Sequence, residues 1–227
     1  PEPVFRKVEV TVATRNAIEL RNKMLTYNYT LAYLNHKYCK PLMRTLFFEN
    51  PENRALFNYD VSFLWGPDIL VSPVLEKGIS EKEVVFPEGS NWFDFYNEVK
   101  HEGGQTNIVP VVADHIPTYV RGGAFIPMTP IIQNTEEYNP ENLELHYYFD
   151  DTVEQSSGLY YHDDGVQANA VALGHYELLE FFSEIKNNEL QIKINKSSGA
   201  SELHRLKLII HHLENQSITQ NDSYEWD

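Results

Sequence analysis

Two pairs of neighbouring aspartates are the residues whose types and spacing best suit chemistry. They are Asp150–Asp151 and Asp163–Asp164. Paired carboxylates offer hard oxygen ligands to Ca²⁺, and glycosidases use two acids to cleave a sugar bond. The same sequences are typical of turns, because Asp accepts hydrogen bonds from its own backbone and glycine tolerates a positive φ. We predict a structural turn at each pair, with a calcium site at Asp163 and Asp164 and a catalytic role as the alternatives.

Charged residues inside apolar runs form a second group of candidates. Arg44 lies in KPLMRTLFFE and Arg121 in YVRGG, where a guanidinium needs a carboxylate or carbonyl partner. We predict a structural salt bridge for each, with substrate binding as the alternative. Asp68 follows Gly66–Pro67 in the apolar run FLWGPDILVSPVLEKG. It is predicted to accept backbone N–H groups of a turn, with catalysis as the alternative.

Other residue patterns give little chemistry. His211 and His212 are adjacent on a predicted strand, where neighbouring side chains face opposite ways, so we predict surface histidines and no shared metal site. The sequence contains no phosphate-binding loop, serine elbow, HExxH, CxxC or EF-hand motif. Aromatic residues could stack on sugar rings, although core packing is the commoner fate of strand aromatics. Those considered for stacking are Trp92, Phe93, Tyr160 and Tyr161.

Composition narrows the class of protein. The chain has 227 residues and a formal net charge of -15, which disfavours binding to nucleic acid or to an anionic membrane. A single cysteine excludes an internal disulfide. No stretch approaches the roughly 18 apolar residues of a membrane-spanning helix. The sequence starts at Pro1 with no initiator Met and no signal peptide, so we expect that the natural N-terminus is missing.

The elements that must position these residues change along the chain. From about Thr14 to Tyr38 there is no Gly or Pro, and apolar residues recur at roughly helical spacing, which predicts one long helix that stops before Pro41. Its wide apolar surface needs a partner.

Short runs rich in branched and aromatic residues follow that helix, punctuated by Gly and Pro, and predict antiparallel β structure. The predicted strands are Leu42–Glu49, Phe63–Leu75, Glu83–Phe86, Trp92–Tyr96, Thr106–Val112 and Tyr119–Ile126. A polar segment at 133–142 is predicted to link them to a second, smaller β unit. The predicted fold class is mainly β, with two antiparallel β-sandwich domains preceded by one long α-helix.

Several stretches, in order, resemble family 31 glycoside hydrolases. RNAIELRNKMLTYNYTLAYLNHKYCKPLMRTLFFENPEN is similar to the end of the family's catalytic barrel and the start of the next domain. FLWGPDILVSPVLEKG, WFDFYN, IPTYVRGGAFIPM and LYYHDDG are similar to its later landmarks. The resemblance spans about Arg15 to Ser183. It implies the last helix of a truncated (β/α)8 barrel at 1–40, a proximal β-sandwich at 41–135 and a distal one at 141–227.

The resemblance also implies which parts of the enzyme this sequence lacks. Family 31 enzymes use a retaining mechanism with two aspartates, and neither of their motifs occurs here, so no catalytic residue can be assigned and the chain by itself is predicted to be inactive. The implied function is that of the non-catalytic C-terminal β domains of an α-glycosidase, most simply an α-glucosidase. The alternatives are an autonomous carbohydrate-binding β-sandwich, or a parent enzyme that is an α-xylosidase or an α-transglucosylase.

Cofactors, partners and location follow from the same resemblance. No cofactor and no metal is implied. The expected partners are the missing catalytic barrel and, for the parent enzyme, an α-linked oligosaccharide substrate; no nucleic acid and no membrane is expected. The sequence leaves open the choice between glucose and xylose, between hydrolysis and transfer, and between bacterial periplasm and cytoplasm.

Overall fold

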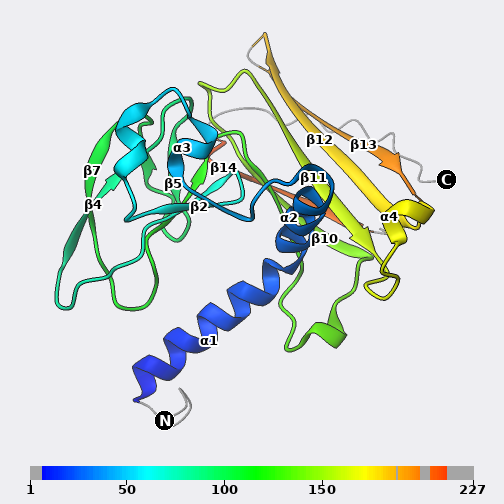
Figure 1. Ribbon diagram of the computed structural model, residues 1–227, viewed down its shortest axis with the longest axis horizontal. Coiled ribbons are helices and arrows are strands. Elements are labelled where there is room, and N and C mark those ends of the chain that lie inside the picture. The colour runs from blue at the N-terminus through cyan, green and yellow to red at the C-terminus, as the bar shows by residue number, and fades with distance from the viewer. Residues whose placement is uncertain (1–6, 188, 200–204, 214–227) are drawn as a thin grey trace.

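A computed structural model describes residues 7–187, 189–199 and 205–213. Its helical segment starts earlier than predicted and consists of two helices, α1 (Val8–Lys23) and α2 (Leu25–Tyr38). The prediction of one long helix is therefore wrong at Met24, whose ψ of 6° interrupts the helical backbone. Figure 1 shows α1 projecting from the body of the molecule while α2 runs into it. No helix in the described ranges is long and apolar enough to cross a membrane.

The first β unit is built on a six-stranded antiparallel sheet in the order β1-β2-β3-β8-β5-β6. Its strands are β1 (Met43–Arg44), β2 (Phe63–Trp65), β3 (Ile69–Val71), β5 (Trp92–Asp94), β6 (Lys100–His101) and β8 (Thr118–Arg121). The long apolar run of the sequence forms β2 and β3, joined by a tight turn at Gly66. A side chain at Gly66 is excluded, since a Cβ would lie 2.2 Å from the Tyr27 hydroxyl and the backbone φ is +65°.

The predicted strand Leu42–Glu49 is only partly correct. Its first half is β1, but its second half is the short helix α3 (Leu46–Glu49), followed by the 3-10 helix η2 (Arg54–Asn58). The helical turn buries Leu46 completely and brings the Glu49 carboxylate back to the Arg44 guanidinium. A separate antiparallel pair, β4 (Glu81–Val85) and β7 (Thr106–Pro110), packs with these helices over one face of the large sheet.

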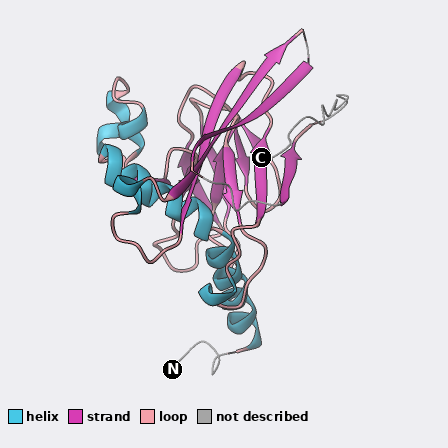
Figure 2. Ribbon diagram, turned by 90° about the vertical axis from the view of Figure 1, so that its right-hand side faces the viewer, coloured by secondary structure: helices cyan, strands magenta, loops and turns pink. Residues whose placement is uncertain are grey.

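The second β unit contains two three-stranded sheets (Figures 1 and 2). One has the order β14-β10-β9 and the other β11-β12-β13. The strands are β9 (Phe125–Met128), β10 (Asn142–Tyr148), β11 (Gln155–Asp163), β12 (Tyr176–Lys186), β13 (Glu189–Ser198) and β14 (Arg205–His211), with η3 (Thr135–Glu137) and α4 (Ala170–Leu173) in the connections. The mainly β fold class is confirmed, with one exception to its antiparallel pattern among the described strands: β14 runs parallel to β10. The domain division at 135–141 stays a prediction.

Three apolar clusters hold these layers together. One lies between the large sheet and the β4–β7 pair and includes Leu70 and Tyr119. A second covers the opposite face of the large sheet, where Ile69 and Val120 meet Leu31 of α2. A third fills the space between the two three-stranded sheets. Alternate side chains of β3 and β8 thus pack into two different cores, and α2 contributes buried residues to one of them.

Candidate functional site

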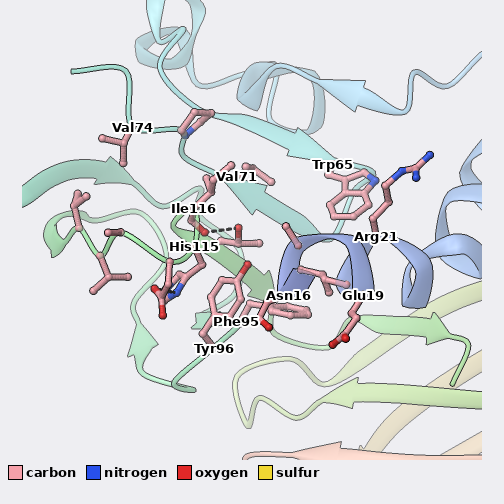
Figure 3. A pocket seen from close by; sticks show the side chains of 18 of the residues that line it. Asn16, Glu19, Arg21, Trp65, Val71, Val74, Phe95, Tyr96, His115 and Ile116 are labelled. Carbon is pink, nitrogen blue, oxygen red and sulfur yellow. Dashed lines mark hydrogen bonds and ion pairs between the residues drawn. The ribbon is translucent and has the colours of Figure 1, made fainter. Parts of the chain in front are cut away.

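A large groove lies between α1 and one face of the six-stranded sheet. Its volume is about 1110 Å³, and Figure 3 shows Trp65 and Val71 of the sheet, with Phe95, around the turn of α1 that carries Asn16 and Glu19. Most of the groove surface is apolar. Pairing of β2 with β3 sets Phe63 opposite Val71, which places apolar side chains on one side of the hairpin.

Charged and polar groups lie in the same groove. Nδ1 of His115 lies 2.7 Å from Oδ1 of Asp114, and the His115 ring lies 3.8 Å from the Tyr96 ring, centroid to centroid. Arg21 and Glu19 of α1 also line the groove. An apolar centre with a polar surround is typical of a surface that binds another protein segment.

Helix α1 adds further apolar surface beside the groove. None of its residues is buried. Val8, Val10, Val12 and Ile18 are 75%, 45%, 51% and 50% exposed. The described residues attach α1 mainly through its C-terminal end, where Asn22 donates to the Ile132 carbonyl and the Lys23 carbonyl accepts the Thr129 N–H. The rest of the helix is therefore free to contact another structure.

The structure places the three predicted structural residues in two clusters. Asp68 does lie in the β2–β3 turn, and Oδ1 of its carboxylate is 2.6 Å and 3.2 Å from Nη2 and Nε of Arg121. Arg44 is buried, donates to the Pro41 carbonyl at 2.7 Å, and pairs with Glu49. The Asp68 carboxylate therefore accepts hydrogen bonds from the Arg121 guanidinium on β8, whereas the sequence led us to expect backbone N–H donors. Both arginines have the carboxylate partner that an apolar strand requires.

Asp163 and Asp164, the candidate calcium ligands, are engaged in hydrogen bonds within the protein. Asp163 accepts from the hydroxyls of Tyr29 and Tyr161 and from the Gly165 N–H. Oδ1 of Asp164 accepts the N–H groups of the second and third residues after it, at 3.0 Å and 2.9 Å. Within the described ranges, no group of three or more His, Cys, Asp or Glu side chains could hold a metal ion.

The other acidic pair has one buried and one exposed member. Asp150 is 2% exposed and accepts from the backbone and side chain of Asn91 at 2.8 Å and 2.9 Å, and from Thr152. Burial alone would raise the pKa of Asp150, but these hydrogen bonds hold it below its ordinary value. Gly122 makes the approach possible, since a Cβ there would lie 2.3 Å from the Asp150 carboxylate. Asp150 thus connects the two β units and is not aimed into a cleft.

Two groups of side chains were missed by sequence reasoning. The first joins α2 to β11: Tyr33 stacks on Tyr161 with ring centroids 4.3 Å apart, and Tyr29 donates to Asp163. Burial and the Asp163 carboxylate raise the pKa of both Tyr29 and Tyr161. The spacing of Tyr29 and Tyr33, four residues apart on a helix, is a signal that could have indicated a shared tyrosine face.

The second missed group involves histidine. The prediction that His211 and His212 lie on the surface is wrong, because both are partly buried and stacked on aromatic rings. The His211 ring lies 4.3 Å from that of Tyr148, and the His212 ring lies 3.9 Å from that of Phe93. No local pattern indicates this, since the stacking depends on β14 lying beside β10.

Comparison with known proteins identifies relatives for most of the chain. A profile of the glycosyl hydrolase family 31 C-terminal domain matches residues 39–126. An α-xylosidase from Saccharolobus solfataricus is 36% identical over 156 residues, which cover 63% of this chain and 21% of the xylosidase. An α-glucosidase 2 from Bacillus thermoamyloliquefaciens is 29% identical over 210 residues, covering 92% of this chain and 26% of that enzyme.

Solved structures agree with the sequence matches. A family 31 dextranase from Flavobacterium johnsoniae, solved in complex with isomaltotriose, superposes with a TM-score of 0.87 and 29% identity. The match covers 94% of this chain and 27% of the dextranase. The chain therefore spans about a quarter of the length of these three relatives.

Proposed function

Because residues 39–126 are a glycosyl hydrolase family 31 C-terminal domain in a chain that resembles family 31 enzymes over most of its length, we propose that the chain is the C-terminal β region of an α-glycosidase. In this proposal it supports a catalytic (β/α)8 barrel, which supplies the two aspartates of a retaining mechanism. The substrate of the whole enzyme is an α-linked oligosaccharide. Relatives named for glucosides and for xylosides match comparably well, so the proposal does not choose between the two sugars.

The observation that carries this proposal is the unpartnered apolar surface of α1 and the adjoining groove. The groove of about 1110 Å³ is mainly apolar, and four aliphatic residues of α1 beside it are exposed. The (β/α)8 barrel that the family resemblance implies upstream of this region is the partner that fits. Docking would bury this surface, which gives the helix a structural role that it lacks in the chain by itself.

The arrangement of acids supports a non-catalytic role. A retaining glycosidase needs two carboxyl groups roughly 5 Å apart on either side of the sugar bond. The candidate acids of this chain are instead occupied: Asp68 by Arg121, Asp150 by Asn91, and Asp163 by two tyrosine hydroxyls. Carboxylates held in this way serve folding.

The alternative of an autonomous carbohydrate-binding module has less support. It relies on exposed aromatic platforms, but Trp92, Phe93, Tyr160 and Tyr161 are between 0% and 4% exposed. The rings of Trp92, Phe93 and Tyr160 pack in apolar clusters, and Tyr161 stacks on Tyr33 of α2. A sugar cannot stack on a ring that is covered by protein.

An assay of the chain and a chimera test the proposal. The purified chain should not hydrolyse p-nitrophenyl α-glucoside or α-xyloside. When it replaces the matching region of the Flavobacterium dextranase, the chimera should hydrolyse dextran. Val12→Asp, which places a charge on the exposed face of α1, should lower the yield of active chimera at least about fivefold.

Val166→Asp is the matched control, because Val166 is 88% exposed on a loop of the second β unit and does not line the groove. It should leave the yield unchanged. Hydrolysis by the chain alone would overturn the non-catalytic role. Equal effects of the two substitutions would overturn docking through α1.

A further inference from the structure

A continuous chain of hydrogen bonds joins the end of β14 to the six-stranded sheet. Nδ1 of His146, on β10, is 2.9 Å from Nε2 of His211, the last residue of β14. Nδ1 of His211 is in turn 3.0 Å from Oε1 of Glu98. Glu98 lies between β5 and β6 with a φ of +63°. These three side chains therefore connect the β14-β10-β9 sheet to the segment between β5 and β6 of the six-stranded sheet.

The order of donors in this chain follows from chemistry. The Glu98 carboxylate only accepts, so Nδ1 of His211 carries a proton and donates to it. In neutral His211 the other nitrogen, Nε2, then accepts from Nδ1–H of His146. This leaves Nε2 of His146 without a proton; it is buried and has no hydrogen-bond partner among the described residues.

The charged groups around the pair come from four elements. Oε2 of Glu144, on β10, lies 3.9 Å from Nε2 of His146, outside hydrogen-bond range. The Glu144 carboxylate is already paired with two lysines, at 3.5 Å and 3.3 Å. The titratable and charged groups that face the two histidines lie on several elements. They are Glu144 and the stacked ring of Tyr148 on β10, Lys207 on β14, His212 directly after β14, Lys23 on α1, and Glu98 between β5 and β6.

We propose that His146 and His211 form a pH-dependent latch, which joins the end of β14 to β10 at neutral pH and releases it in acid. The pair tolerates a first proton. On His211 this proton gives the hydrogen bond to Glu98 a charge-assisted character. His146 then carries its own proton at Nε2 and accepts the Nε2–H of His211 at Nδ1. A second proton leaves two imidazolium rings with N–H groups facing each other across 2.9 Å. Two cations this close repel strongly.

The environment of the pair sets the pH of release. Burial lowers the pKa of His146 to about 4, and the positive charges of His211 and Lys23 act in the same direction. In the unfolded state a histidine has a pKa of about 6.5. Between these values the unfolded state binds more protons than the folded one, so stability falls as the pH falls through this window. The hydrogen bond from His211 lowers the pKa of Glu98, so this carboxylate stays charged until the pH falls below its ordinary range.

The latch is accessible, and it acts on a strand that can move. Both His146 and His211 line the groove, so protons reach them from solvent. Among the described residues, strand β14 lies at the edge of its sheet and pairs with β10 alone. Repulsion between the two rings therefore weakens the side-chain contact between β10 and the end of this strand.

Nuclear magnetic resonance and hydrogen exchange on the full chain test the latch. The Cε1–H resonance of His146 should titrate below pH 5. Protection of the β14 amides, corrected for the intrinsic pH dependence of exchange, should fall at least about tenfold from pH 7 to pH 4. A His146 resonance that titrates near pH 6.5, or protection of β14 that does not change with pH, would overturn the proposal without any variant.

Two substitutions separate the latch from general acid effects. His146→Gln keeps a donor toward His211 but removes the titration, so it should flatten the loss of β14 protection between pH 6.5 and 4. His36→Gln, at an exposed histidine near the end of α2, should leave the wild-type pH dependence unchanged. If both variants flatten it equally, or neither does, the latch is wrong.

Discussion

The two helices of the N-terminal segment have opposite environments although they follow one another without a loop. α2 buries five residues, including Tyr27, Leu31 and Tyr33, whereas α1 buries none. The difference comes from what lies beside each helix: α2 meets β9, β11 and the large sheet, while most of α1 projects past them (Figure 1). Helical periodicity thus indicates which side of a helix is apolar, but the strands decide whether that side is covered.

The largest expected effect on stability comes from comparing substitutions of one apolar residue in each helix. Leu31→Ala in α2 should destabilise the chain by about 3 kcal/mol, because it opens a cavity at a side chain that is 2% exposed. Ile18→Ala in α1 removes a side chain that is 50% exposed and should change stability by less than about 0.5 kcal/mol. Urea unfolding followed by circular dichroism measures both. Similar losses would show that α1 is as buried as α2.

A smaller effect tests how closely α2 contacts the β2–β3 turn. Gly66→Ala should cost about 2 kcal/mol, because the new methyl group collides with Tyr27 and the backbone φ is +65°. Gly78→Ala has a comparable φ of +83° but nothing within 4 Å, so it should cost only about 1 kcal/mol. Thermal unfolding of both variants gives the difference, which isolates the collision from the backbone strain. Equal costs would mean that Tyr27 moves aside freely.

The smallest effect concerns the polar part of the α2 contact. Asp163→Asn should destabilise by about 1 kcal/mol, since the hydroxyls of Tyr29 and Tyr161 lose a charged acceptor. Asp151→Asn is the control. The Asp151 side chain is 74% exposed, and its ion pair with the Lys100 ammonium is long at 3.8 Å, so the substitution should change stability by less than about 0.5 kcal/mol. The midpoint of urea unfolding measures both. An unchanged midpoint for Asp163→Asn would mean that only the stacked tyrosine rings stabilise the contact between α2 and β11.

Local chemistry made part of this molecule predictable. The turn at Gly66–Pro67 and Asp68 follows from turn residues inside an apolar run, and the pairing of β2 with β3 confirms it. The segment after Pro41 was harder, because the branched and aromatic residues that favour a strand also suit the buried side of a short helix. Local propensity did not show that Glu49 must return to Arg44.

Long-range pairing explains most of what could not be predicted. Asp68 meets Arg121 only because β3 pairs with β8. His146 meets His211 only because β14 lies parallel to β10 in one register. The sequence supplies the residue types for such contacts, but the register that joins them depends on the whole sheet.

The parallel pairing of β14 with β10 has a consequence during biosynthesis. Asn142 pairs with Arg205, so the ribosome must make more than sixty further residues before β10 receives this neighbour. Until then the nascent chain carries an open strand edge beside apolar side chains, which is a template for wrong association. Truncation before β14 should therefore make the newly made protein depend more on chaperones than truncation after it.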